Sequence, residues 1–158
     1  MSEELPQLLP PIIEYDQKYQ EGIISLIYTT LEEFGSHFDP GLPIDEDLTR
    51  IREVYNGRSR FWVALDGDVV IGTVAIREVD QNIAELKRMF VGRAFRGKRV
   101  GLALLEHAMQ FARSAGYKDV QLDTSQSMHR AHRFYEQYGF QKIREDGQKI
   151  YYRLSLNP

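Results

Sequence analysis

The chain has 158 residues, a size typical of one compact domain, and 42% of them are hydrophobic, enough for a packed core. It contains no cysteine, which excludes disulfides, thiolate metal ligands and cysteine nucleophiles. A formal net charge of −3 argues against a dedicated nucleic-acid-binding protein. No apolar run approaches the roughly 20 residues that span a membrane, and no secretion signal begins the chain. We therefore expect a cytoplasmic protein with neither nucleic acid nor a membrane as partner.

The predicted elements follow one another without a linker, a repeat or a low-complexity tract. Taken in chain order, they are a strand at 12–15, helices at about 17–31 and 46–54, strands at 61–65, 69–76 and 83–91, a helix at 100–115, a strand at 120–124, a helix at 128–138, and strands at 140–144 and 149–154. Asp16 and Asp45 can cap the first two helices. Asp66-Gly67 is a hairpin signal, because such turns need positive φ.

The helix predicted at 100–115 carries one apolar stripe and ends at Gly116, which suits a left-handed stop. The stripe consists of Leu102, Leu105, Met109 and Ala112. This helix lies between two predicted strands, and such a crossover places the two strands parallel. The order of elements therefore predicts one mixed α/β domain over residues 1–158, with residues 1–10 as a tail.

Two segments of the chain carry opposite charge. The stretch from Tyr19 to Thr49 has seven acidic residues and no Lys or Arg. The stretch from Leu86 to Leu105 has six basic residues and no acid. One interpretation is that both charged stretches are solvated faces. The other is that the basic stretch forms a site for an anion and the acidic stretch lies near a site for a cationic ligand.

The segment Phe95-Arg96-Gly97-Lys98-Arg99-Val100-Gly101 joins a predicted strand to the start of a helix. Free backbone N–H groups and the positive end of the helix dipole make such a junction an anion site. Gly97 and Gly101 allow the backbone to approach a phosphate closely. No Gly-Lys-Ser/Thr follows, so this is not a Walker loop, and an ATP-dependent enzyme is disfavoured. A pyrophosphate is the anion that fits best, and a solvated basic turn is the alternative.

Four segments in this order resemble the GNAT superfamily of acyl-CoA-dependent N-acetyltransferases. They read AELKRMFV at 84–91, RGKRVG at 96–101, LDT at 122–124 and FYEQYGF at 134–140. The resemblance covers roughly residues 60–154. It implies an α/β (α+β) fold: a mostly antiparallel central sheet of six or seven strands, a splayed parallel pair in its middle, and about four flanking helices. It also implies acetyl-CoA as co-substrate and an amine as acceptor.

By this resemblance, the pyrophosphate of acetyl-CoA binds the amides of the phosphate loop, residues 96–101. These are Arg96, Gly97, Lys98, Arg99, Val100 and Gly101. The pantetheine arm would pair like an added strand with Met89, Phe90 and Val91, and a bulge in this strand would help to open the gap. The family usually has glycine at Arg99, so this amide is presented either without positive φ or with strain. Met128 stands where the family frequently has asparagine, so a polar contact to the pantetheine arm is either missing or supplied by Ser125 or Ser127.

Acyl transfer needs a neutral amine, a stabilised oxyanion and a protonated leaving sulfur. Tyr135 matches the family's tyrosine and is the expected acid, with core packing as the alternative interpretation. Phe134 is the better core candidate, and Tyr138 is a weaker acid. A backbone N–H near Met89 or Val91 is the expected oxyanion donor.

Glu85 is the candidate base, acting through water, and matches a glutamate of some family members. Strand alternation predicts that Glu85, Lys87 and Met89 share one face, with Leu86 and Phe90 on the other. An ion pair of Glu85 with Lys87 or Arg88 is the alternative, and Asp123 is a weaker base. The histidines, which are His37, His107, His129 and His132, have no convincing ligand spacing, so we expect no metal.

In this family the first helices shape the acceptor site. The acidic residues at 19–49 indicate a cationic amine: a polyamine, an aminoglycoside or a lysine side chain. In that case neutralising Asp45, Glu46 and Asp47 should raise the acceptor KM. The aromatic residues Tyr28, Phe34, Phe38 and Tyr55 fit an amino acid or aryl amine equally well. A non-catalytic acyl-CoA sensor is the alternative function, and a homodimer formed through an edge strand at 151–154 is a further expectation.

Overall fold

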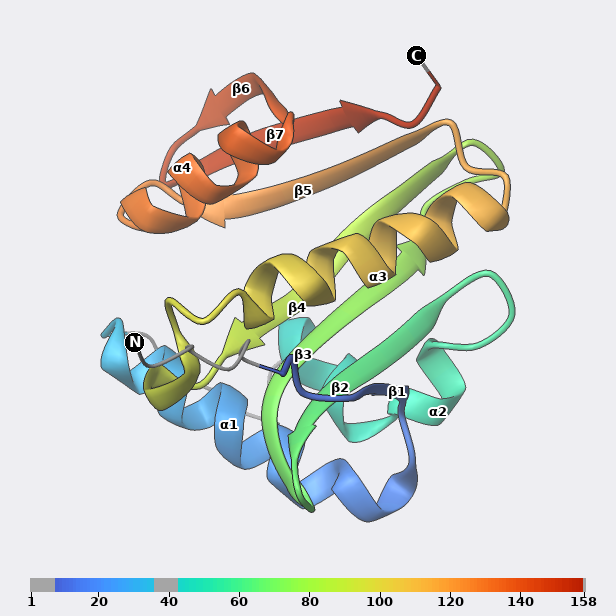
Figure 1. Cartoon of the computed structure of the whole chain (residues 1–158). Coiled ribbons are helices and arrows are strands. Elements are labelled where there is room, and N and C mark those ends of the chain that lie inside the picture. Colours follow the sequence, from blue (N-terminus) through green and yellow to red (C-terminus); the bar gives the residue numbers. More distant parts are fainter. Residues whose placement is uncertain (1–7, 36–42, 158) are drawn as a thin grey trace, which may run out of the picture.

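The computed structural model describes residues 8–35 and 43–157, without the side chains of residues 43–45. Its strands are β1 (Ile12–Glu14), β2 (Arg60–Asp66), β3 (Val69–Glu78), β4 (Ile83–Val91), β5 (Asp119–Ser125), β6 (Gln141–Asp146) and β7 (Lys149–Ser155). They form one sheet in the order β1-β2-β3-β4-β5-β7-β6 (Figure 1). Only β4 and β5 pair in parallel, and the other neighbours are antiparallel. The predicted mixed sheet with a central parallel pair is confirmed.

Helices cover both faces of the sheet. They are α1 (Gln20–Glu33), α2 (Ile51–Val54), α3 (Val100–Ser114) and α4 (His129–Tyr138), with 3₁₀ turns η1 (Gln17–Tyr19), η2 (Pro43–Thr49) and η3 (Arg93–Phe95). The second predicted helix is thus wrong in part: it is a 3₁₀ segment followed by a single α-turn. The break falls at Arg50, whose φ of −138° leaves the helical region. Asp16 caps η1 by accepting a hydrogen bond from the Lys18 N–H.

Two apolar clusters hold these layers together. One joins the sheet to α3 and α4, and the other joins it to α1, η2 and α2. Leu105, Met109 and Ala112 of the predicted α3 stripe are buried, but Leu102 is 36% exposed and Leu104 belongs to the core. Leu102 lies in the first turn of α3, which borders the cavity described below rather than the sheet.

β4 and β5 pair over only three residues, from Ile83 to Glu85 on β4. Beyond Glu85 the two strands diverge (Figure 1). The register between β3 and β4 shifts here, so that Arg88 and Met89 together oppose the single residue Val74. This is a β-bulge, and Arg88 has a φ of +54°. Because a bulge bends its strand, it opens the gap as expected.

The bulge also reverses which side chains face α3. Before it, Ala84 and Leu86 pack in the α3 cluster; after it, Met89 and Val91 pack there, and Phe90 faces the α1 cluster. The expectation that Met89 shares a face with Glu85 and Lys87 is therefore wrong. One inserted residue is enough to exchange the two faces of a strand.

The last strand is not an edge. β7 lies between β5 and β6, and β6 forms the edge of the sheet. The expected dimer contact through residues 151–154 as an exposed edge is therefore wrong, because both edges of β7 are already paired.

Candidate active site

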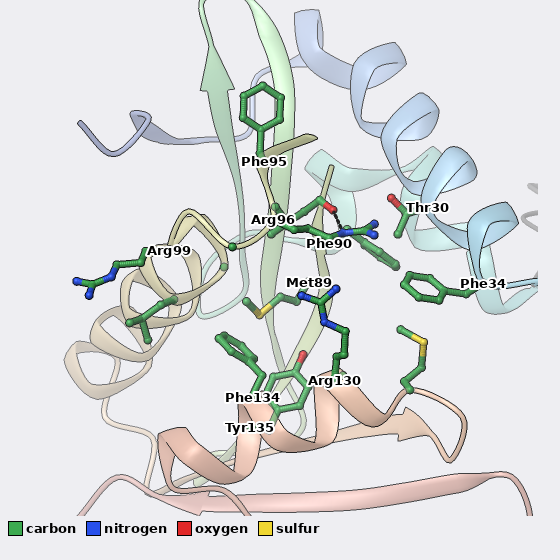
Figure 2. Close-up of a pocket in the computed structure, with 16 residues that line it drawn as sticks. Thr30, Phe34, Met89, Phe90, Phe95, Arg96, Arg99, Arg130, Phe134 and Tyr135 are labelled. Carbon is green, nitrogen blue, oxygen red and sulfur yellow. Dashed lines mark hydrogen bonds between the residues drawn. The ribbon is translucent and has the colours of Figure 1, made fainter. Parts of the chain in front are cut away.

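The gap between β4 and β5 opens into a cavity of about 430 Å³. Its walls are the bulged end of β4, the phosphate loop, the start of α3, the end of α1 and α4 (Figure 2). Seven of the residues expected to bind the donor line it: Met89, Phe90, Val91, Arg96, Gly97, Arg99 and Gly101. The fold thus brings the splayed strand and the phosphate loop to one cavity.

Tyr135 contributes the only hydroxyl of α4 in this lining. Its ring is buried between Phe134, Phe140 and Tyr152, at centroid distances of 5.3, 5.6 and 6.4 Å. The hydroxyl points into the cavity (Figure 2) and makes no hydrogen bond with the residues that the structure describes. Burial raises the pKa of Tyr135, so the phenol is protonated at neutral pH and can donate a hydrogen bond.

Tyr138, the weaker candidate acid, does not line the cavity. It is the last residue of α4, and its ring centroid lies 6.2 Å from that of Phe140. Of the two tyrosines, only Tyr135 is placed to meet a bound thioester.

The phosphate loop presents backbone groups rather than side chains. Gly97 and Arg99 have φ of +75° and +65°. Of the two arrangements open for Arg99, the structure has the strained one, which costs about 1–2 kcal/mol in a residue with a Cβ. The first bond within α3 runs from the Ala103 N–H to the Arg99 carbonyl. The amides that precede it in the helix are left for an anion.

The side chain of Arg96 forms hydrogen bonds within the protein. Its guanidinium donates two hydrogen bonds to Glu33 of α1, at 2.6 and 2.9 Å, and Nε donates to the Val91 carbonyl at 3.0 Å. These bonds lower the pKa of Glu33 below its usual value. A contact of Arg96 with phosphate would therefore come from its backbone, as the sequence suggested.

Three other predicted donor residues lie outside the cavity lining. Val100 is buried in the core beneath the loop, and Lys98 is exposed, with Nζ 5.7 Å from the Phe95 ring centroid. Ser125 ends β5, where its Oγ lies 3.0 Å from that of Ser127. The side chain that lines the cavity in this region is Met128.

Glu85 also lies outside the lining. Its carboxylate is 3.6 Å from the Lys87 ammonium, which is the ion pair that the sequence left open. Asp123 is 3.4 Å from Lys149. The role of Glu85 as a base remains a prediction.

A buried cluster beside the cavity was missed by the sequence analysis. Arg88 donates to both carboxylate oxygens of Asp47, at 3.0 and 2.6 Å, and Tyr55 donates to the same carboxylate at 2.6 Å. Burial alone would raise the pKa of Asp47, but the hydrogen bonds from Arg88 and Tyr55 outweigh it and lower the pKa. The cluster connects the β4 bulge to η2 and to the residue that follows α2.

Arg130 of α4 was not singled out from the sequence either, yet it lines the cavity. Thr30 of α1 and Phe34, which directly follows α1, complete the facing wall. Nothing in the sequence distinguishes Arg130 from Arg133, because only the packing of α4 decides which of them faces the gap.

Two other features bear on function. No helix in the described ranges is long and apolar enough to cross a membrane. Within residues 8–35 and 43–157, no three His, Asp or Glu side chains are grouped so as to hold a metal ion. His129 and His132 have ring centroids 5.7 Å apart, and His132 Nε2 is hydrogen-bonded to the Ser125 carbonyl. His37, Phe38 and the side chain of Asp45 lie outside the described residues.

Comparison with known proteins gives a consistent result. The model of the acetyltransferase (GNAT) family matches residues 24–140. N-acetyltransferase 8F1 of Rattus norvegicus is 35% identical over 114 residues, which cover 68% of this chain and 52% of that protein. The chain spans between 29% and 52% of the length of the curated relatives that it matches.

Solved structures agree with this family. An acetyltransferase from Streptococcus agalactiae 2603 is 28% identical, with a TM-score of 0.83 over 92% of this chain and 97% of that one. An aminoglycoside 6'-N-acetyltransferase complexed with coenzyme A shares the fold at 18% identity, with a TM-score of 0.73 over 94% and 98% of the two chains.

Proposed function

Because the chain belongs to the acetyltransferase (GNAT) family, we propose that it transfers the acetyl group of acetyl-CoA to a primary amine. The observation that carries the proposal is the cavity between β4 and β5. A free strand edge, a phosphate loop and the hydroxyl of a buried tyrosine all meet there (Figure 2).

The donor would lie along this cavity. Its pyrophosphate binds the amides of the phosphate loop, where Gly97 and Arg99 turn the backbone. Its pantetheine arm pairs with Met89, Phe90 and Val91 on the edge of β4 that β5 leaves unpaired beyond Glu85. This arrangement directs the thioester toward Tyr135.

The reaction joins the amine nitrogen to the carbonyl carbon and breaks the carbon–sulfur bond. A backbone N–H near Met89 or Val91 stabilises the oxyanion. Tyr135 gives its proton to the leaving sulfur and regains one from the nitrogen, so that one proton passes in total from nitrogen to sulfur. Glu85, working through water, is the proposed base that keeps the amine neutral.

For the acceptor, the charges disfavour a polycation. Three acids of the segment at 19–49 already face arginines: Glu33 with Arg96, Glu46 with Arg50, and Asp47 with Arg88. Paired acids offer little attraction to a cationic amine. The aromatic side chain of Phe34 in the cavity wall supports an amino acid or aryl amine instead.

The test is calorimetric titration with acetyl-CoA, followed by thiol release with a panel of primary amines. Tyr135→Phe should lower kcat roughly 100-fold and leave acetyl-CoA affinity nearly unchanged, because it removes one proton donor and no packing. Tyr138→Phe is the matched control, since this tyrosine lies outside the cavity.

Two results would contradict the proposal. Acetyl-CoA binding without turnover on any amine would favour the acyl-CoA sensor. Equal losses in the two tyrosine variants would mean that Tyr135 serves only the core.

A further inference from the structure

Among the residues that the structure describes, the cavity lining contains three arginines, Arg96, Arg99 and Arg130, and no carboxylate. Arg96 is already paired with Glu33. Arg99 and Arg130 form no hydrogen bond or ion pair with any residue in the described part of the chain. The described part of the chain therefore supplies no counter-charge for these two cations, and an anionic ligand can supply it.

The two arginines are on different walls (Figure 2). Arg99 precedes α3, and its side chain points outward beside the phosphate loop. Arg130 rises from α4 into the cavity, toward β4 and the wall that carries Thr30 and Phe34. Donor phosphates on the loop account for Arg99 but leave Arg130 beside the space that remains for the acceptor.

Around Arg130 the wall is apolar. Three aromatic rings and one thioether line it: Phe34 after α1, Phe90 of β4, Phe134 of α4 and Met128. The guanidinium of Arg130 in this apolar part of the cavity suits a ligand that has one anionic group and an otherwise apolar structure.

We propose that the acceptor is an α-amino acid with an apolar side chain and that Arg130 binds its carboxylate. This inference rests on the proposed function and deepens it by naming the substrate class. A guanidinium holds a carboxylate through two parallel hydrogen bonds, which fixes orientation as well as position. The α-amine is one carbon away, so it is held in the same cavity as Tyr135. Its nitrogen bonds to the acetyl carbon, the carbon–sulfur bond breaks and one proton moves from nitrogen to sulfur, giving an N-acetyl amino acid and free CoA.

Pairs of amines with and without a carboxylate test whether the enzyme prefers an acceptor that carries this group. L-phenylalanine is compared with 2-phenylethylamine, and L-methionine with 3-(methylthio)propylamine, at equal concentrations of free base. Each pair differs only in the carboxylate. We expect kcat/KM to be at least about tenfold higher for an amino acid than for its decarboxylated partner.

Substitutions in α4 test whether Arg130 is the residue that binds the carboxylate. Arg130→Gln should remove most of that preference, and Arg130→Lys should keep part of it because the charge remains. Arg133→Gln, on the same helix but outside the cavity, is the control and should keep the full preference. Acetyl-CoA affinity of Arg130→Gln should stay within about twofold of the parent value, since the donor phosphates lie at the loop.

The outcomes separate this inference from the proposed function. Thiol release with amines but without a carboxylate preference overturns the inference and leaves the proposed function standing. A tenfold loss of acetyl-CoA affinity in Arg130→Gln also overturns it, because Arg130 would then serve the donor. No thiol release with any amine overturns both.

Discussion

Two arginines have a left-handed backbone conformation, and only one of them, Arg99, lines the cavity. Arg88 forms the β4 bulge with a φ of +54°, and Arg99 precedes α3 with a φ of +65°. The side chain of Arg88 is 11% exposed and donates two hydrogen bonds to Asp47, whose carboxylate also accepts one from Tyr55. The side chain of Arg99 is exposed and has no partner among the described residues.

This difference separates two ways of maintaining a strained backbone. At the bulge, the strain is held by contacts within the protein, because Asp47 fixes the guanidinium and Thr73 Oγ1 donates to the Arg88 carbonyl. At the phosphate loop, no side-chain contact among the described residues offsets the strain, which is the pattern expected of a backbone arranged for a ligand. The bulge is thus held by the protein's own contacts and serves the fold, whereas the loop is arranged to bind a ligand.

The largest effect should come from Arg88→Gly. Glycine relieves the backbone strain, but it removes the only guanidinium that faces Asp47 in the described structure and leaves a buried carboxylate. We expect the free energy of unfolding to fall by about 3–5 kcal/mol, measured by urea denaturation. A stable Arg88→Gly protein would mean that the ion pair does not hold the bulge.

The pH dependence of the unfolding free energy tests the same ion pair between Arg88 and Asp47. Asp47 has a lowered pKa in the folded protein, against an ordinary value of 3.8. Its charge therefore stabilises the fold above about pH 4, and this contribution is lost as the pH falls through the folded pKa. We expect unfolding free energies of the parent and of Asp47→Asn to differ most near neutral pH and to converge in acid.

The exposed pair of Glu46 and Arg50 supplies the control. Glu46→Gln should change stability by no more than about 0.5 kcal/mol, because surface pairs contribute little. A gap between parent and Asp47→Asn that stays constant down to pH 3 would contradict the role given to the Asp47 charge.

Local patterns predicted most of the fold, and long-range contacts are what they missed. The strand at 83–91 and its bulge were expected, and the change of face could have been read from the spacing of Leu86 and Met89. The ion pairs of Arg88 and Arg96 could not have been predicted from local patterns, because their partners lie 41 and 63 positions away in the sequence. Charge runs at 19–49 and 86–105 suggested separate sites, whereas three-dimensional folding joins acids of the first to arginines of the second.

Gly97→Ala tests whether the loop backbone itself binds the donor. At a φ of +75° with open space around the new Cβ, the substitution adds only backbone strain, and we expect a loss of about 1 kcal/mol in stability. Gly116→Ala at the end of α3 has a φ of +87° and equally open space, so it should cost a similar amount. Only Gly97→Ala should also weaken acetyl-CoA binding severalfold; equal affinities in the two variants would argue against a phosphate site at the loop.

Arg99→Gly should change stability far less than Arg88→Gly, and in the opposite direction. Glycine removes the left-handed strain without breaking a side-chain contact, so stability should rise by about 0.5–1 kcal/mol. Arg99→Ala keeps the strain and removes the same guanidinium, so it should leave stability almost unchanged. If the guanidinium meets a phosphate, both variants should weaken acetyl-CoA binding by about threefold. A loss of stability in Arg99→Gly would show instead that the arginine side chain braces the loop, and the contrast with Arg88 would disappear.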